Sequence, residues 1–368
     1  MRRVVVAPDK FKGSATAHQV ARAIAQGIRR VAPHAEIVSI PMADGGDGTV
    51  DVFVDAGWQQ QTVGVHDALG RSVEARFALD GGRAVVELAS ASGLALLAPG
   101  ERDPWRADTR GTGELIRAAL DAGAREIVVG IGGSATNDAG IGMLRALGAR
   151  TEPPDALHGV RRIDLSTMDA RLKETRLTVA SDVDNPLCGP AGASRVFGPQ
   201  KGATPDDVAR LDAALAQTAD AMAAAIGRDL RDERGAGAAG GAGFALMAIG
   251  GKIRPGVDIV AELRGLPKAL KGSGLCVTGE GAIDAQTLHG KTISGVGRYA
   301  SQTGVPVIAF AGAIDAGAET ELWKHGIACV SITAGPMRLE DAMRDAETLL
   351  TAAAARAVRL LLLEEERL

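Results

Sequence analysis

The stretch 41–49 places two aspartates, Asp44 and Asp47, among three glycines, directly after the strand-like run 36–40. Glycines let backbone N–H groups come close to an anion, and carboxylates are the hard oxygen ligands that hold a phosphate-bound Mg²⁺. The pattern predicts Asp44 and Asp47 as metal or substrate ligands. The glycines predicted to approach the phosphate are Gly45 and Gly46. The alternative is an acidic surface turn.

Two lysines precede the first expected helix. Lys10, Lys12 and Ser14 lie in one short loop, and Thr16 and Gln19 then form a capping box ahead of apolar residues at helical spacing. The N-terminus of a helix favours anions, because its backbone N–H groups and its dipole point toward the ligand. Contact with phosphate is the prediction, and solvated surface lysines are the alternative.

The glycine-rich stretch 130–140 follows an expected strand and enters an expected helix at 138–147, with Asn137 as its candidate N-cap. A backbone of this kind cradles phosphate at a helix N-terminus. The stretch matches the dinucleotide-binding fingerprint only weakly, because the helix would start several residues too late and no acidic strand end follows about 20 residues on. The residues predicted to form the cradle are Gly132, Gly133 and Ser134, and Asn137 is a further candidate for binding substrate or phosphate.

Carboxylates and a lysine follow a later expected strand. Glu280 and Asp284 lie among small residues there, and Lys291 comes a little further along the chain. We predict the two carboxylates as metal ligands and Lys291 as a phosphate-binding lysine, with a solvated lysine as the alternative. Gly279 and Gly281 would bring the backbone close to the phosphate.

Several familiar catalytic motifs are missing from the sequence. The stretch 289–292 resembles the end of a P-loop, but Ala285 stands where that motif requires glycine, so a standard P-loop is absent. The six histidines include no His-x-x-x-His pair, which argues against a zinc centre. No Gly-x-Ser-x-Gly sequence is present, so a hydrolase triad has no anchor.

A turn follows another expected strand, at 177–180. It holds Asp182, Asp184 and Asn185 ahead of Pro186, which would rigidify it. A carboxylate in this position suits a general base or a metal ligand, and Asn185 is a candidate substrate ligand. The alternative is an Asx turn that only ends the strand.

Composition excludes some partners. The chain has 368 residues, 46% of them apolar, which is enough for two domains, and its net charge of −4 argues against a nucleic-acid or membrane-surface partner. No apolar stretch approaches the ~20 residues of a membrane span, and the start of the chain has no signal-peptide pattern. The three cysteines are widely spaced, which is typical of reduced thiols. A cytoplasmic protein acting on small molecules is therefore expected.

Two groups of elements would carry these residues. The first is a parallel α/β pattern with expected strands at 4–7, 37–40, 275–278, 305–310 and 328–332. The second contains a β-meander and further α/β elements, with strands at 61–65, 73–79, 84–88, 126–129 and 177–180 and helices at 112–122, 138–147 and 206–226. We therefore predict an α/β fold with a discontinuous parallel-sheet domain at 1–60 and 271–368 and an inserted mixed α/β domain at 61–270.

The ends of the five parallel strands give the strongest structural argument for a site. Ligands bind outside the carboxyl edge of an open parallel sheet. Glycines, carboxylates and lysines follow the strands in the segments 9–13, 44–47, 279–284 and 312–315, with 334–335 after the last strand. We expect these groups to meet at one rim, although the last two segments would also serve as simple turns.

Six motifs together resemble the type 1 glycerate kinase family, and the resemblance runs along almost the whole chain. They include Ala-Pro-Asp-Lys-Phe-Lys-Gly-Ser at 7–14 and Met-Ala-Asp-Gly-Gly-Asp-Gly-Thr at 42–49; the other four lie at 130–140, 181–189, 197–202 and 278–284. The resemblance implies a flavodoxin-like domain with an inserted second α/β domain. It also implies ATP-dependent phosphorylation of D-glycerate, with 2-phosphoglycerate as the favoured product. Together with the acidic and glycine-rich loops, this predicts ATP and Mg²⁺ as cofactors. We further expect a monomer or small homo-oligomer.

Phosphoryl transfer mainly requires that the reactants be positioned and the charge of the transferred group be neutralised. For such a kinase we expect Lys10, Lys12 and Lys291 to clamp phosphate or carboxylate groups and Asp182 to act as the base. Arg71, on a turn of the meander, would bind the carboxylate of glycerate or would be a plain surface arginine.

Two other functions remain open at this point. The weak fingerprint at 130–140 permits an NAD-linked hydroxyacid dehydrogenase. A non-catalytic sensor that binds a small acid is the other alternative. Release of ADP in the presence of glycerate would exclude the sensor, and a change in nicotinamide absorbance would support the dehydrogenase.

Overall fold

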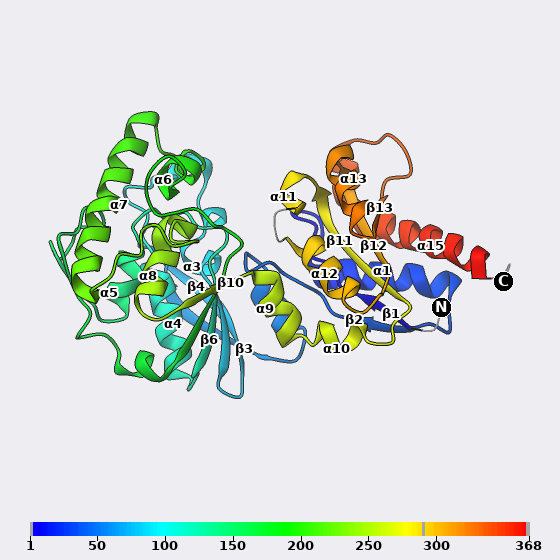
Figure 1. The fold of residues 1–368 in the computed structure, drawn as a ribbon, viewed down its shortest axis with the longest axis horizontal. Helices are drawn as coiled ribbons and strands as arrows, with labels where there is room; N and C mark the ends of the chain where they lie inside the picture. Colours follow the sequence, from blue (N-terminus) through cyan, green and yellow to red (C-terminus); the bar gives the residue numbers. More distant parts are fainter. Residues whose placement is uncertain (1–2, 289–290, 366–368) are drawn as a thin grey trace. The chain divides into compact units, whose positions relative to one another are not determined.

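In the computed structural model, which describes residues 3–288 and 291–365, the chain forms two compact units (Figure 1). One combines Met1–Asp44 with Val257–Leu368, and the other is Gly45–Gly256. We call the first the terminal unit and the second the central unit. The domain limits predicted after residues 60 and 270 stay a prediction.

The terminal unit is built on a five-stranded sheet with the order β13-β12-β11-β1-β2, in which every strand pair is parallel. The strands are β1 (Arg3–Val6), β2 (Glu36–Ser39), β11 (Leu275–Ile283), β12 (Val307–Ile314) and β13 (Ile327–Ser331). The five strands predicted from the sequence are therefore confirmed as members of one parallel sheet.

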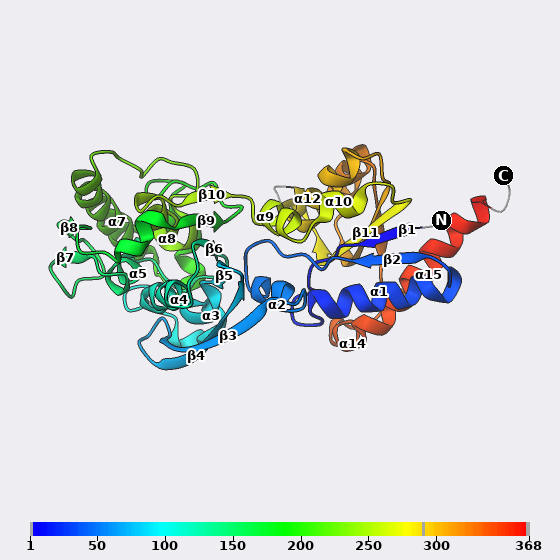
Figure 2. The ribbon, with the colours of Figure 1, turned by 90° about the horizontal axis from the view of Figure 1, so that it is seen from below.

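Helices cover both faces of this sheet. In Figure 2, one face carries α1 (Ala17–Val31), α14 (Leu339–Arg344) and α15 (Ala346–Glu365), and the other carries α10 (Leu266–Leu270) and α12 (Thr292–Ser301). The remaining helices of this unit are α9 (Gly256–Leu263), α11 (Ala285–Leu288) and α13 (Ala316–Lys324). Val4, Val5 and Val6 of β1 are fully buried, as expected for a parallel sheet covered on both faces.

The start of α1 confirms a local prediction. The Thr16 hydroxyl accepts a hydrogen bond from the backbone N–H of Gln19 at 3.2 Å, and the Gln19 side chain accepts one from the backbone N–H of Thr16 at 2.8 Å. This reciprocal capping box begins the helix at Ala17. It also fixes the end of the lysine-containing loop that precedes the helix.

The central unit contains a six-stranded mixed sheet with the order β10-β9-β6-β5-β4-β3. The predicted meander is confirmed, because β3 (Gln59–His66), β4 (Ser72–Asp80) and β5 (Arg83–Glu87) pair antiparallel. The sheet continues in parallel through β6 (Glu126–Gly130), β9 (Arg176–Ala180) and β10 (Lys252–Arg254). Sequence analysis missed β10 and the pair β7 (Arg150–Glu152) and β8 (Arg162–Asp164), because each of these strands is only three residues long.

The helices of the central unit include the predicted long helix, observed as α7 (Pro205–Ile226). The others are α2 (Thr49–Val54), α3 (Ala89–Ser92), α4 (Arg110–Asp121), α5 (Ile141–Ala146), α6 (Ala193–Phe197) and α8 (Ala242–Ala248). Within residues 3–288 and 291–365, none of the helices has the length and apolar character that a membrane crossing needs.

The helix predicted at 138–147 starts later than expected. Helix α5 begins at Ile141 after Gly140, whose φ of 72° is left-handed, so Asn137 is not its N-cap. The reason is Asp138, which is fully buried and whose carboxylate accepts hydrogen bonds from the backbone N–H groups of Gly140 and Gly142. These bonds hold 138–140 as a turn and extend the glycine-rich loop toward the helix.

Candidate active site

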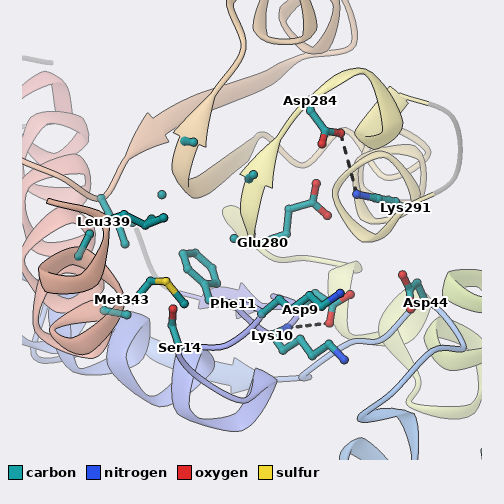
Figure 3. Close-up of a pocket in the computed structure, with 18 residues that line it drawn as sticks. Asp9, Lys10, Phe11, Ser14, Asp44, Glu280, Asp284, Lys291, Leu339 and Met343 are labelled. Atoms are coloured by element: carbon teal, nitrogen blue, oxygen red, sulfur yellow. Dashed lines mark hydrogen bonds and ion pairs between the residues drawn. The ribbon is translucent and has the colours of Figure 1, made fainter. Parts of the chain in front are cut away.

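The terminal unit contains a cavity of about 460 Å³ at the carboxyl edge of its sheet (Figure 3). This volume is in the range of small-molecule sites. Segments that follow β1, β2 and β11, the end of β12 and the helix α14 contribute to its lining. The cavity gathers eight of the predicted site residues: Lys10, Lys12, Ser14, Asp44, Glu280, Gly281, Asp284 and Lys291.

Strand β11 is longer than the sequence indicated. Its pairing with β12 continues to Ile283 opposite Ile314, whereas its pairing with β1 runs only from Leu275 to Val277. Gly279, Glu280 and Gly281 therefore lie inside a strand that extends beyond its β1 neighbour, and not in a loop. This extension presents Glu280 at the cavity.

Asp9 is a cavity residue that sequence analysis did not select. Its Oδ2 accepts a hydrogen bond from the Thr292 hydroxyl at 2.6 Å, and its Oδ1 accepts one from the backbone N–H of Lys10 at 2.6 Å. Burial and the neighbouring charge of Asp44 raise the pKa of Asp9 to about 7. The position of Asp9 after the first strand could have identified it, but the site prediction for this loop selected the neighbouring Lys10 and Lys12.

Glu280 is buried and lies among the same charges. Its carboxylate accepts a hydrogen bond from the Thr287 hydroxyl. Burial raises its pKa to about 7, and the charges of Asp284 and Asp44 act in the same direction, against the effects of the Thr287 bond and the Lys291 charge. The cavity therefore holds a group of carboxylates that repel one another and that a cation would stabilise.

Lys291 lies at the N-terminus of α12, where it is the N-cap residue. Its Nζ is 3.9 Å from Asp284 Oδ1, and about a third of the side chain is exposed (Figure 3). The first turn of α12 adds backbone N–H groups at the same place, so this corner suits a phosphate group. His289 and Gly290, of the P-loop-like stretch, lie outside the described residues.

The candidate metal ligands fit Mg²⁺ only in combination with a substrate. In the described part of the chain, no three His, Cys, Asp or Glu side chains are grouped closely enough to hold a metal ion by themselves. Mg²⁺ is usually bound by one or two carboxylates together with substrate phosphates. Asp44 and Glu280, whose charges act on each other, would supply carboxylates of that kind, and substrate phosphates would complete the set.

In the central unit, the acidic loop packs directly on the glycine-rich stretch. The Gly132 N–H donates to the Gly45 carbonyl at 3.4 Å. A Cβ on Gly132 would lie 2.8 Å from the Cα of Gly46, and one on Gly130 would lie 2.4 Å from the Gly45 carbonyl oxygen. Only glycine allows this approach, so these glycines bring two predicted phosphate-binding backbones together within the unit.

The buried Lys201 holds the glycine-rich loop 130–140 through hydrogen bonds. Lys201 is 2% exposed, and its ammonium donates to the Ser134 hydroxyl at 2.8 Å and to the Thr136 carbonyl at 2.7 Å. Burial lowers its pKa to about 7, against the effect of the Asp138 charge. The motif at 197–202 contained this lysine, but nothing in the sequence showed that it reaches the loop from a distant segment.

Asn137 is fully buried beside the same lysine-supported loop. Its Nδ2 donates to the Ser194 hydroxyl at 3.0 Å, and its Oδ1 has no hydrogen-bond partner among the described residues. A buried carbonyl oxygen without a partner is uncommon in proteins and calls for an explanation. It is available to a donor that is not part of the described chain.

The other predicted residues of the central unit have local partners. Asp182 Oδ1 accepts from the Gly256 N–H at 3.2 Å, and Asn185 Nδ2 donates to the Ala191 carbonyl at 2.8 Å. Arg71 forms ion pairs with the carboxylates of Asp67 and Glu101. Burial is the main cause that raises the pKa of Glu87 to about 7. The charge of Asp47 acts in the same direction, so Asp47 lies near Glu87.

The fold and the cavity together indicate a protein that binds phosphorylated ligands. An α/β protein whose parallel sheet edge gathers lysines, carboxylates and a helix N-terminus is equipped to bind phosphorylated ligands. Comparison with known proteins narrows this class, since the model of the glycerate kinase family matches residues 4–362. The chain belongs to the glycerate kinase family, and it is therefore a kinase.

Individual relatives agree over nearly the full length. A protein named glycerate kinase from Halalkalibacterium halodurans is 46% identical over 96% of this chain and 97% of its own. A glycerate 2-kinase from Escherichia coli K12 is 42% identical over 94% of both chains. A crystal structure of a Salmonella typhimurium LT2 protein, 42% identical, superposes with a TM-score of 0.87 over 99% of both chains. The resemblance stated from six motifs is confirmed.

Proposed function

We propose that this chain transfers the γ-phosphoryl group of ATP to the 2-hydroxyl of D-glycerate, which gives ADP and 2-phosphoglycerate. The observation that carries the proposal is the family match over residues 4–362, together with 42% identity to a protein named glycerate 2-kinase. In this reaction the 2-hydroxyl oxygen bonds to the γ-phosphorus, the bond from that phosphorus to the β–γ bridging oxygen breaks, and the hydroxyl proton passes to a base.

The terminal unit would hold phosphate groups. Lys10, Lys12 and Lys291 line one cavity and supply positive charge, and the N-terminus of α12 adds backbone donors. Ser14 and Gly281 line the same cavity, and Gly279 lies just before it in β11. We assign these residues to phosphate binding, since their charge and backbone groups match a polyanion.

We propose Asp44, Glu280 and Asp284 of the terminal unit as Mg²⁺ ligands. Asp47, in the central unit, stays a metal ligand predicted from the sequence. When bound, the ion would neutralise phosphate charge. The raised pKa values of Asp9 and Glu280, which burial and neighbouring carboxylates cause, support this assignment. Carboxyl groups whose pKa is raised in this way would release their protons when a cation binds.

The central unit would contribute a backbone cradle at Gly132, Gly133 and Ser134, next to Gly45 and Gly46. Lys201 positions this loop through its bonds to Ser134 and Thr136. The Oδ1 of Asn137, which has no hydrogen-bond partner in the described part of the chain, supports a polar ligand near the loop. Asp182 remains our proposed base, and Asn185 and Arg71 remain proposed substrate ligands.

We also propose that the terminal unit has the flavodoxin-like fold, with the central unit inserted into it. Numbered along the chain, the five strands of the terminal unit run 2-1-3-4-5 across the sheet, which is the flavodoxin-like order. The limits at 60 and 270 remain our proposed domain limits. The cytoplasmic location and a monomer or small homo-oligomer likewise stay predictions from the sequence.

The function is tested by following ADP release with D-glycerate and a panel of other hydroxyacids, with and without EDTA. We expect release with ATP and D-glycerate that EDTA abolishes. A nicotinamide absorbance change without ADP release would favour the dehydrogenase instead. Tight binding of glycerate without any turnover of ATP would favour the sensor.

A further inference from the structure

One end of the cavity in the terminal unit is apolar and has no assigned role. Its wall comes from Phe11 after β1, Ile332 after β13, and Leu339 and Met343 of α14. Figure 3 shows Leu339 and Met343 at the end opposite Asp284, Lys291 and Asp44, with Phe11 between the two ends. The cavity therefore changes from charged to apolar along its length.

The apolar end of the cavity combines buried side chains with an exposed one. Phe11 and Ile332 are 4% and 2% exposed, so they form a buried floor, whereas Leu339 at the rim is 70% exposed. The lining also includes four small residues: Gly281, Ala282, Gly312 and Ala313.

The apolar end is also attached to the loop that carries the lysines. A Cβ on Gly13 would lie 2.9 Å from Met343 Cε, so α14 packs directly on that loop. Phe11 and Ala15 exchange two backbone hydrogen bonds of 2.9 Å, which fixes the Phe11 backbone. The apolar wall and Lys10 and Lys12 are therefore parts of one continuous structure.

The chemistry of the two reactants decides what this end accommodates. Every carbon of glycerate carries an oxygen atom, so glycerate has no apolar face. The triphosphate of ATP is a polyanion that belongs with the lysines. The base of ATP is the only flat, weakly polar part of either molecule, and it suits an aromatic ring, a thioether and a leucine.

We propose that the terminal unit binds the nucleotide, with its adenine base against Phe11, Leu339 and Met343 and its phosphates directed toward Lys10, Lys12 and Lys291. This inference rests on the proposed kinase function and adds the location of the base. It makes α14 the element that recognises the nucleoside part of the substrate.

The test compares Leu339→Ala and Met343→Ala with the matched control Met337→Ala. Met337 is also a large apolar residue, 42% exposed, and does not line the cavity. Calorimetry on the full chain measures binding of ATP, adenosine and inorganic triphosphate, and thermal unfolding verifies that the variants fold. We expect Leu339→Ala and Met343→Ala to weaken ATP and adenosine binding by about 5- to 30-fold, with triphosphate binding and the control unchanged.

Two results would overturn the proposal. If folded Leu339→Ala and Met343→Ala bind ATP like the wild type, the base lies elsewhere. If inorganic triphosphate loses as much affinity as ATP, the two side chains act on the phosphate end or on cavity shape. Turnover of D-glycerate by the wild type is measured separately, so a failed kinase function shows as absent turnover and not as unchanged nucleotide binding.

Discussion

Lys291 of the terminal unit and Lys201 of the central unit carry the same ammonium group, but one lines a cavity and the other is buried. Lys291 lines an open cavity with 31% of its side chain exposed and lies 3.9 Å from a carboxylate oxygen. Lys201 is 2% exposed and donates to two oxygens of the glycine-rich loop. Lys291 can contact a bound ligand directly. Lys201 instead holds a loop whose backbone is the candidate phosphate-binding group. Residue type alone does not separate a binding group from a supporting one; burial and partners do.

The largest expected effect concerns Asp182, the proposed base. Asp182→Asn keeps a side-chain oxygen that can accept from the Gly256 N–H, so the local structure should persist. We expect kcat to fall by roughly 10²–10⁴-fold with little change in KM for ATP, measured by steady-state ADP release. Asp184→Asn is the control, because Asp184 is exposed and pairs with Arg234. Near-normal kcat in Asp182→Asn would remove Asp182 as the base.

A second prediction tests Lys291, the lysine that lines the cavity. Lys291→Met should lower kcat by roughly 10²–10³-fold, because it removes a positive charge aimed at the transferred group. Lys324→Met is the matched control, since Lys324 forms a surface pair with Glu321 outside the cavity. Equal activities of the two variants in the same assay would place Lys291 outside the reaction.

A third prediction concerns the close packing that Lys201 supports. Gly132→Ala should reduce the free energy of unfolding by about 1–3 kcal/mol, because its Cβ would lie 2.8 Å from the Gly46 Cα. Gly64→Ala is the control, because no atom of the described residues lies within 4 Å of a Cβ on Gly64. Urea unfolding measures both variants, and equal stabilities would show that the two loops do not need this contact.

The last prediction concerns the pH dependence of stability that Lys201 causes. Burial lowers the pKa of its ammonium to about 7 from 10.5, so between these values the unfolded chain binds more protons than the folded one. The free energy of unfolding therefore gains a term that rises with pH above about 7. Lys201→Met lacks this term, so the wild type should gain stability over the variant between pH 7 and pH 9 in urea unfolding. A difference that stays constant with pH would contradict the buried, weakly protonated state.

Much of the terminal unit could be predicted from the sequence because its signals are local. Apolar strands and the Thr16 capping box depend on neighbouring residues, and the rule for parallel sheets then places the strand ends at one edge. This reasoning located Asp44, Glu280 and Lys291, which line the cavity. It failed to select Asp9, whose environment depends on Thr292, far along the chain.

What escaped prediction depends on distant contacts. The extra length of β11 comes from its pairing with β12, and the late start of α5 comes from the buried carboxylate of Asp138, which also binds Thr109. The role of Lys201 needs the fold that brings it under Ser134. The apolar end of the cavity combines Phe11 with α14, at opposite ends of the chain, so no single motif contains it.

The most direct test of the central claim is the position of the phosphoryl group on the product. The chain, ATP, Mg²⁺ and D-glycerate are incubated, and the product is examined by ³¹P NMR with proton coupling. The account predicts one new phosphomonoester signal split by the single proton on C2, which identifies 2-phosphoglycerate. A signal split by the two protons on C3, or no new phosphomonoester while the ATP remains intact, would contradict it.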